Sequence, residues 1–84
     1  MTVYHSPRFE RSLFRLSEKS QEKAERCENM FRANPFDRRL KSHKLHGKMQ
    51  GLWSFSVDRR YRILFEFDGD DVIFLDIGAH DLYK

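Results

Sequence analysis

The chain has 84 residues and a net charge of +3 at pH 7, and 14% of its residues are aromatic, which fits one small folded domain over residues 1–84 and excludes a disordered chain. The single cysteine, Cys27, excludes an internal disulfide and a cysteine zinc cluster and favours a reducing compartment. No apolar run approaches the ~20 residues that span a bilayer and no signal peptide is visible, so a cytoplasmic location without membrane contact is expected.

The first half of the chain predicts a strand followed by a helical hairpin. Residues 2–6 alternate weakly and predict a short strand. Ser6 and Pro7 then supply an N-cap and a proline at the first helical position. The dipeptide Asn34-Pro35 ends the second helix, because the residue before a proline is disfavoured in the helical region. Two apolar stripes at helical spacing are expected to face the core: Phe9, Leu13 and Leu16, then Ala24, Cys27, Met30 and Phe31.

The second half changes to a period of two and predicts antiparallel strands. Residues 52–57 and 61–67 alternate, residues 68–71 (DGDD) predict a tight hairpin, and residues 72–78 are apolar enough for burial on both faces. The expected fold class is therefore α+β: an N-terminal strand, a helical hairpin, then an antiparallel β-sheet. The side chains expected under the helices are Trp53, Phe55, Val57, Tyr61, Ile63, Phe65 and Phe67.

The basic residues gather in the middle of the chain. Residues 37–48 carry five lysines and arginines, and residues 59–62 carry three arginines, whereas acidic residues accumulate after Arg62. A positive patch beside an acidic edge suits a polyanion such as nucleic acid, and the alternative is a solvated charged surface.

The outer face of the sheet is expected to carry the chemistry. Alternation along opposing strands places Arg62 beside two serines, and a core-facing Leu45 would aim its two neighbours to the same side. The chain end leaves the sheet nearby. The expected members of this surface are Lys44, His46, Ser54, Ser56, Arg62, His80 and Tyr83.

This set of side chains suits RNA cleavage without a metal or other cofactor. Histidine and tyrosine can carry protons, and an arginine fork matches phosphate geometry. A two-metal nuclease would need convergent carboxylates, and here the acids lie mostly in the DGDD turn. Each residue also has a structural interpretation: His80 could cap a strand, Tyr83 could be a packed ring, and Arg62 could pair with Glu66.

Three stretches in order resemble the RelE/ParE toxin superfamily of bacterial toxin–antitoxin systems. They are HKLHGKMQGLWSFSV, YRILFEF and IGAHDLY. The last is similar to the IGTHDxVY ending of the RelE/StbE branch, shortened by one residue before the tyrosine. The resemblance covers almost the whole chain and implies a RelE-like fold. It also implies a ribosome-dependent, metal-independent mRNA endoribonuclease that inhibits translation.

The resemblance assigns roles to residues that match the family's motifs. The YafQ-like pattern H-x-L-x-G-x-x-x-G is met by His43, Leu45, Gly47 and Gly51. By the same resemblance, Arg62 clamps the scissile phosphate, His80 or His43 is the catalytic general base, and Tyr83 is the terminal aromatic. The residues expected to contact the RNA are Lys44, His46, Arg59 and Arg60.

The resemblance also has departures and implies partners. Ser54 and Ser56 stand where RelE has two lysines, and Ser56 replaces a second YafQ-type histidine, which leaves the proton donor unassigned. ParE relatives share the fold, lack ribonuclease activity and poison DNA gyrase, so a gyrase inhibitor is the alternative; a plain RNA- or protein-binding module is the third. The expected partners are mRNA on the ribosome and an antitoxin whose acidic segment wraps the basic face in a hetero-oligomer.

Overall fold

The structure is a computed structural model that describes residues 1–79 and residue 82. Its α+β architecture matches the predicted fold class. No helix in the described part is both long and apolar enough to cross a membrane. The elements in chain order are β1 (Val3–His5), α1 (Pro7–Phe14), α2 (Glu18–Ala33), η1 (Arg38–Leu40), β2 (His43–Lys44), η2 (Gly47–Met49), β3 (Trp53–Ser56), β4 (Arg62–Asp68) and β5 (Asp71–Gly78).

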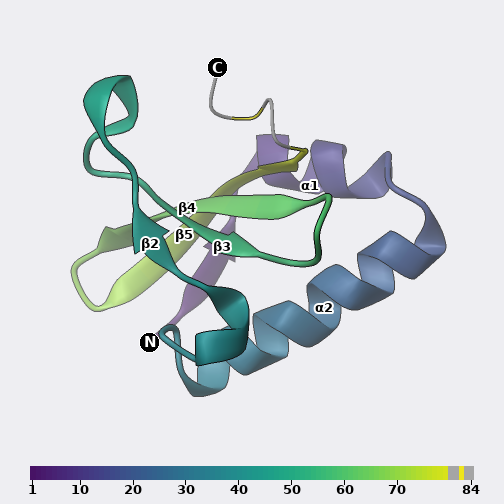
Figure 1. The fold of residues 1–84 in the computed structure, drawn as a ribbon, viewed down its shortest axis with the longest axis horizontal. Coiled ribbons are helices and arrows are strands. Elements are labelled where there is room, and N and C mark those ends of the chain that lie inside the picture. The colour runs from purple at the N-terminus through teal and green to yellow at the C-terminus, as the bar shows by residue number, and fades with distance from the viewer. Residues whose placement is uncertain (80–81, 83–84) are drawn as a thin grey trace.

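The helical hairpin forms where the capping signals predict it. The Ser6 hydroxyl accepts a hydrogen bond from the Phe9 N–H at 3.0 Å and donates one to the Leu75 carbonyl at 2.8 Å, so the cap also ties α1 to β5. Ser17 caps α2, and Asn34 ends it. The chain runs outward along α1 and returns along α2 (Figure 1).

The five strands of the described chain form one sheet in the order β1-β5-β4-β3-β2. Strands β2 to β5 pair antiparallel as predicted, with Gly69 at a positive φ of 61° in the DGDD turn. The sheet is mixed, because β1 pairs parallel to β5, a pairing that the sequence did not assign. Burial alternates along β5 as far as Asp76, and Ile73 and Leu75 are less buried than their neighbours, so the predicted continuous burial on both faces is wrong.

The core lies between the helices and the inner face of the sheet and consists mainly of phenylalanine rings. Phe31 of α2 is fully buried and contacts Phe55, Phe65 and Phe74 with ring centroids 5.0–5.3 Å apart. Phe9 of α1 adds an edge contact to Phe74. The predicted helical stripes therefore do face the core. Cys27 is buried here too, and this burial raises the pKa of its thiol, which argues against a nucleophilic role.

The double role of the Ser6 hydroxyl predicts a measurable stability difference. Ser6→Ala should lower the free energy of unfolding by about 1–3 kcal/mol, because it removes both the helix cap and the bond to Leu75. Ser17→Ala is the matched control, since this cap is exposed and does not reach the sheet; its loss should cost only about 1 kcal/mol. Urea denaturation of both variants makes the comparison, and equal losses would contradict the tie to β5.

Candidate functional site

The strand register brings the predicted residues of the outer face together. Arg62 on β4 is the register partner of Ser56 on β3 and of Gly78 on β5. Ser54 opposes Leu64 in the next row of the same face. Partners in an antiparallel pair share a face, so the prediction that Arg62 and the two serines lie on one side is confirmed.

Arg62 carries the clearest unsatisfied group of the site. Its Nη1 is buried, and it is the one buried side-chain nitrogen or oxygen within the described chain that lacks a hydrogen-bond partner. The expected alternative, a pair with Glu66, is not formed: none of the ion pairs among described residues involves Arg62. A buried guanidinium N–H without an acceptor destabilises the folded state. An anion such as phosphate would accept a hydrogen bond from it.

Asp76, an acid on this face among the described residues, is already engaged. Asp76 is buried and opposes Leu64. Its Oδ2 pairs with the Nε of Arg8 at 3.1 Å, and its Oδ1 accepts the Ile77 N–H at 2.9 Å. Arg8 therefore neutralises the carboxylate that could otherwise compete with a ligand for Arg62. Sequence reasoning missed this pair because α1 and β5 lie far apart in the chain.

His43 lies on the same face as Arg62. It is exposed and is the register partner of Ser54. Its Nδ1–H donates to the Lys41 carbonyl at 2.9 Å, which leaves Nε2 as the acceptor nitrogen of the neutral ring. From sheet spacings, the Cα atoms of His43 and Arg62 lie roughly 12 Å apart. A nucleotide between the two side chains is within reach of both.

Two of the predicted residues do not join the outer face. Lys44 opposes Trp53 and holds its Nζ 5.5 Å from the centre of that ring, on the helix side of the sheet. The prediction for Lys44 rested on a core-facing Leu45, but the Leu45 N–H donates to the Leu52 carbonyl at 2.9 Å. This bond extends the ladder by one residue, so alternation from Lys44 places Leu45 on the outer side. His46 lies beyond β2, exposed, as the residue before η2.

Arg59 and Arg60 lie in the β3–β4 turn, at the Arg62 end of these strands, and both are exposed. Asp58 shapes the turn, because its Oδ1 accepts hydrogen bonds from the backbone N–H groups of Arg60 and Tyr61, each at 2.8 Å. The Nζ of Lys23 lies 3.5 Å from its Oδ2. Burial alone would raise the pKa of Asp58, but these hydrogen bonds outweigh it and the pKa is lowered.

The lowered pKa of Asp58 predicts a pH-dependent contribution to stability. A depressed folded pKa stabilises the fold above the unfolded value near 3.8, and this contribution disappears as the pH falls through the folded pKa. Asp58→Ala should therefore reduce stability at pH 7 and flatten the dependence of Tm on pH below about 4. Asp58→Asn, which keeps an acceptor, should retain more stability but lose the same pH dependence. An unchanged acid profile in both variants would contradict this role.

Leu82 packs against Gly78, the register partner of Arg62. Gly78 opposes Arg62, and the Leu82 N–H bonds to the Ala79 carbonyl at 2.9 Å. A Cβ added at Gly78 would lie 3.1 Å from Leu82 Cδ1, so this leucine packs over the glycine. Glycine thus leaves room for the chain end at this point. The predicted site residues His80 and Tyr83 lie outside the described residues.

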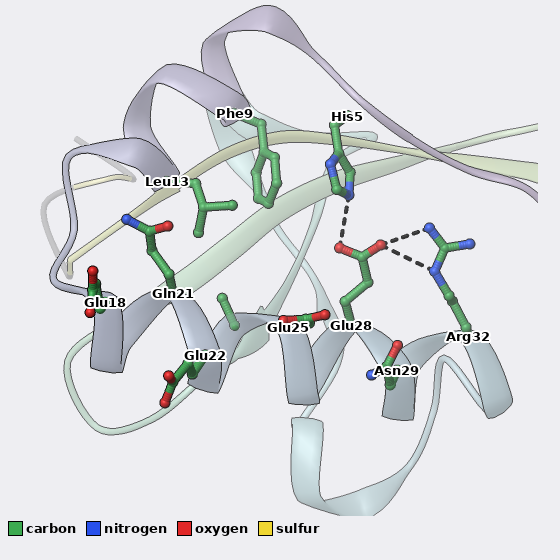
Figure 2. Close-up of a pocket in the computed structure, with 11 residues that line it drawn as sticks. His5, Phe9, Leu13, Glu18, Gln21, Glu22, Glu25, Glu28, Asn29 and Arg32 are labelled. Carbon is green, nitrogen blue, oxygen red and sulfur yellow. Dashed lines mark hydrogen bonds and ion pairs between the residues drawn. The ribbon is translucent and has the colours of Figure 1, made fainter.

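A groove of about 590 Å³ lies between the two helices, away from these residues. Phe9, Leu13 and His5 form one side, and α2 supplies the other (Figure 2). The Glu28 carboxylate contacts both His5 and Arg32: its Oε1 lies 2.8 Å from the Nε2 of His5, and its Oε2 lies 2.7 Å from the Nη2 of Arg32. The groove contains none of the predicted site residues, and its glutamates would repel a polyanion. The acidic lining consists of Glu18, Glu22, Glu25 and Glu28.

Comparison with known proteins identifies the family. The sequence model of the ParE-like toxin domain matches residues 18–84. The chain belongs to this family, and so to the RelE/ParE toxin superfamily. It therefore carries a toxin domain of the kind found in toxin–antitoxin systems. No sequence among the curated proteins matches the chain.

Solved structures of superfamily members share this toxin fold over nearly their whole length. YafQ from E. coli strain BL21(DE3) matches with a TM-score of 0.82 and 15% identity, covering 98% of this chain and 97% of its own. A YoeB/ParE toxin from Agrobacterium tumefaciens matches with a TM-score of 0.79 and 19% identity, covering 95% and 99%. YafQ in the E. coli DinJ–YafQ toxin–antitoxin complex matches with a TM-score of 0.79 and 15% identity, covering 98% and 96%.

Proposed function

We propose that this toxin domain is a metal-independent, ribosome-dependent mRNA endoribonuclease that inhibits translation. The observation that carries the proposal is the buried Nη1 of Arg62, which has no partner within the described part of the chain, on the same face as the Nε2 of His43, which bonds to none of the described residues. One group can hold a phosphate and the other can accept a proton. Catalysis that relies on such groups needs no metal ion.

The proposed reaction is transesterification at phosphorus. Nε2 of His43, or the imidazole of His80, removes the proton of the 2′-hydroxyl, and the 2′-oxygen attacks the adjacent phosphorus. Arg62 donates from Nη1 to a non-bridging oxygen of the phosphorane, whose negative charge grows as the bond forms. The bond to the 5′-oxygen then breaks, and that oxygen takes up a proton. Tyr83 orients the substrate or assists this transfer.

The remaining basic residues have supporting roles in the proposal. Arg59 and Arg60, exposed in the β3–β4 turn, contact the RNA backbone on the Arg62 side, and His46 does so from the loop after β2. Lys44 contacts the RNA from the other face of the sheet margin. These contacts are electrostatic and should weaken as salt rises.

An antitoxin is the proposed protein partner. YafQ, whose fold this chain shares, forms a toxin–antitoxin complex with DinJ. We infer that an acidic antitoxin segment covers the basic face in the cytoplasm and blocks the RNA, within a toxin–antitoxin hetero-oligomer. The antitoxin would then supply the acceptor for Arg62 in the inhibited state.

A non-catalytic toxin that inhibits DNA gyrase is the second candidate. The family model that matches residues 18–84 is the ParE-like one, which favours it. In that case Arg62 and His43 would have no role in bond cleavage. A gyrase supercoiling assay with the purified chain tests this candidate directly.

A translation reaction with a defined mRNA tests the ribonuclease proposal. The purified chain should cut the translated message, and the products should carry 2′,3′-cyclic phosphate and 5′-hydroxyl ends, as attack by the 2′-oxygen requires. Removal of Mg²⁺ by a chelator cannot test metal independence here, because ribosomes need the ion. The chemical groups at the product ends are measured instead. Products with 5′-phosphate and 3′-hydroxyl ends would contradict the mechanism, and intact mRNA with inhibited gyrase would favour the second candidate.

A further inference from the structure

A cluster of partly exposed aromatic rings lies on the helix side of the sheet, beside β2. We call it the aromatic corner: Phe36, Trp53, Phe67 and the Lys44 ammonium above Trp53. Phe36 is 56% exposed and Phe67 is 38% exposed. Ring centroids lie 5.7 Å apart for Phe36–Trp53 and 5.3 Å apart for Trp53–Phe67, both edge to face. The core thus continues into an open aromatic surface.

The exposed ring of Phe36 is held by an ordered loop. The Phe36 N–H donates to the Asn34 side-chain oxygen at 3.0 Å, and the Ser42 hydroxyl donates to the Pro35 carbonyl at 2.6 Å. Leu40, fully buried, anchors the same loop. More than half of the Phe36 ring is in water, where it adds little to the stability of the monomer. A ring held in place beforehand also lowers the entropy lost when a ligand stacks on it.

The charges around the aromatic corner favour a polyanion. Asp37 is tied to Arg39 through two hydrogen bonds of 2.8 Å and 3.0 Å, and the same arginine lowers the pKa of Asp37 to about 2. The opposite charges of Asp37 and Arg39 therefore cancel, and the pair adds no net charge to this surface. Alternation along β4 turns the carboxylates next to Phe67 to the opposite face. Between residues 36 and 44, the exposed cations that form no ion pair with a described residue are Arg38, Lys41 and Lys44.

The position of β2 connects the aromatic corner with the Arg62 face. β2 is the last strand of the sheet and only two residues long. Its first residue, His43, opposes Ser54 on the outer face, and its second, Lys44, opposes Trp53 on the aromatic side. A flexible single strand that crosses this short margin would contact both faces.

We propose that the aromatic corner is a stacking site for bases of single-stranded RNA that flank the segment held at Arg62. The proposal rests on the proposed function and extends the substrate-binding surface around the β2 margin. Exposed rings interleaved with unpaired cations are the features by which proteins bind single-stranded nucleic acid without sequence readout: the rings stack on base faces and the cations follow the phosphates.

Trp53 reports on this site because it is the chain's single tryptophan. The experiment titrates the protein with a mixed-sequence ten-nucleotide RNA carrying 2′-O-methyl groups and follows tryptophan fluorescence. Saturable quenching is expected. Phe36→Leu, which keeps apolar volume but removes the ring, should raise Kd roughly 5- to 150-fold, the effect of losing one stacked base. Phe36→Tyr should stay close to wild type.

Phe14→Leu is the matched control, since Phe14 is an 83% exposed ring on α1. It should leave Kd unchanged. The proposal is overturned if RNA fails to quench Trp53, if Phe36→Leu binds like wild type, or if inorganic polyphosphate quenches equally, which would show charge binding alone. Equal quenching by polyglutamate would assign the aromatic corner to an acidic protein segment and would also overturn it. The 2′-O-methyl RNA cannot be cut, so these results are independent of whether the chain is a ribonuclease.

Discussion

Arg62→Ala is expected to lower the rate of mRNA cleavage by roughly 10²- to 10³-fold, the usual effect of removing one preorganised donor to a developing negative charge. The buried Nη1 without a described partner is the donor in question. Arg62→Lys should recover only part of the rate, because an ammonium cannot reproduce the planar fork of a guanidinium on phosphate. Single-turnover cleavage of mRNA on programmed ribosomes measures the three rates.

The same position distinguishes a functional residue from a structural one. Arg62→Met keeps an apolar stem and removes the unsatisfied N–H groups, so the variant should be inactive and yet at least as stable as wild type. Thermal unfolding of wild type and variant gives the comparison. A large fall in Tm together with the loss of activity would show that Arg62 supports the fold instead of a ligand.

Phe31→Ala is expected to have the largest effect on stability. The ring is fully buried and contacts three other phenylalanines, and truncating such a residue costs about 3–5 kcal/mol. Domains gain roughly 0.05–0.15 kcal/mol per residue on folding, so this loss is a large fraction of the total for 84 residues. Urea unfolding followed by circular dichroism measures it.

Phe14→Ala serves as the control for the Phe31 experiment. Its ring is 83% exposed, so its loss should change the free energy of unfolding by less than about 0.5 kcal/mol. A similar loss in both variants would contradict the placement of the core between α2 and the inner face of the sheet.

Local signals in the sequence predicted most of the fold. Ser6-Pro7 and Asn34-Pro35 act through caps and backbone sterics within a few residues, and the structure starts α1 and ends α2 there. The DGDD turn is equally local. The parallel pairing of β1 with β5 joins residues about 70 positions apart, and no local pattern specifies it.

The candidate site was predictable only where alternation over a long strand fixed the register. Arg62 lies in a seven-residue strand and was placed correctly beside Ser56. Lys44 lies in a two-residue strand, which is too short for alternation to fix its face, so its predicted side depended on the side assumed for Leu45. Phe36 follows the end of α2 at Ala33 and lies outside the periodic segments, so periodicity does not report its exposure.

Mapping mRNA 5′ ends in cells is the direct test of whether this toxin domain cuts mRNA with Arg62. Wild type and Arg62→Ala are induced separately, and transcripts are mapped by primer extension. New cuts within translated regions are expected for wild type and none for the variant. Growth arrest with intact mRNA, or the same cuts with Arg62→Ala, would contradict it.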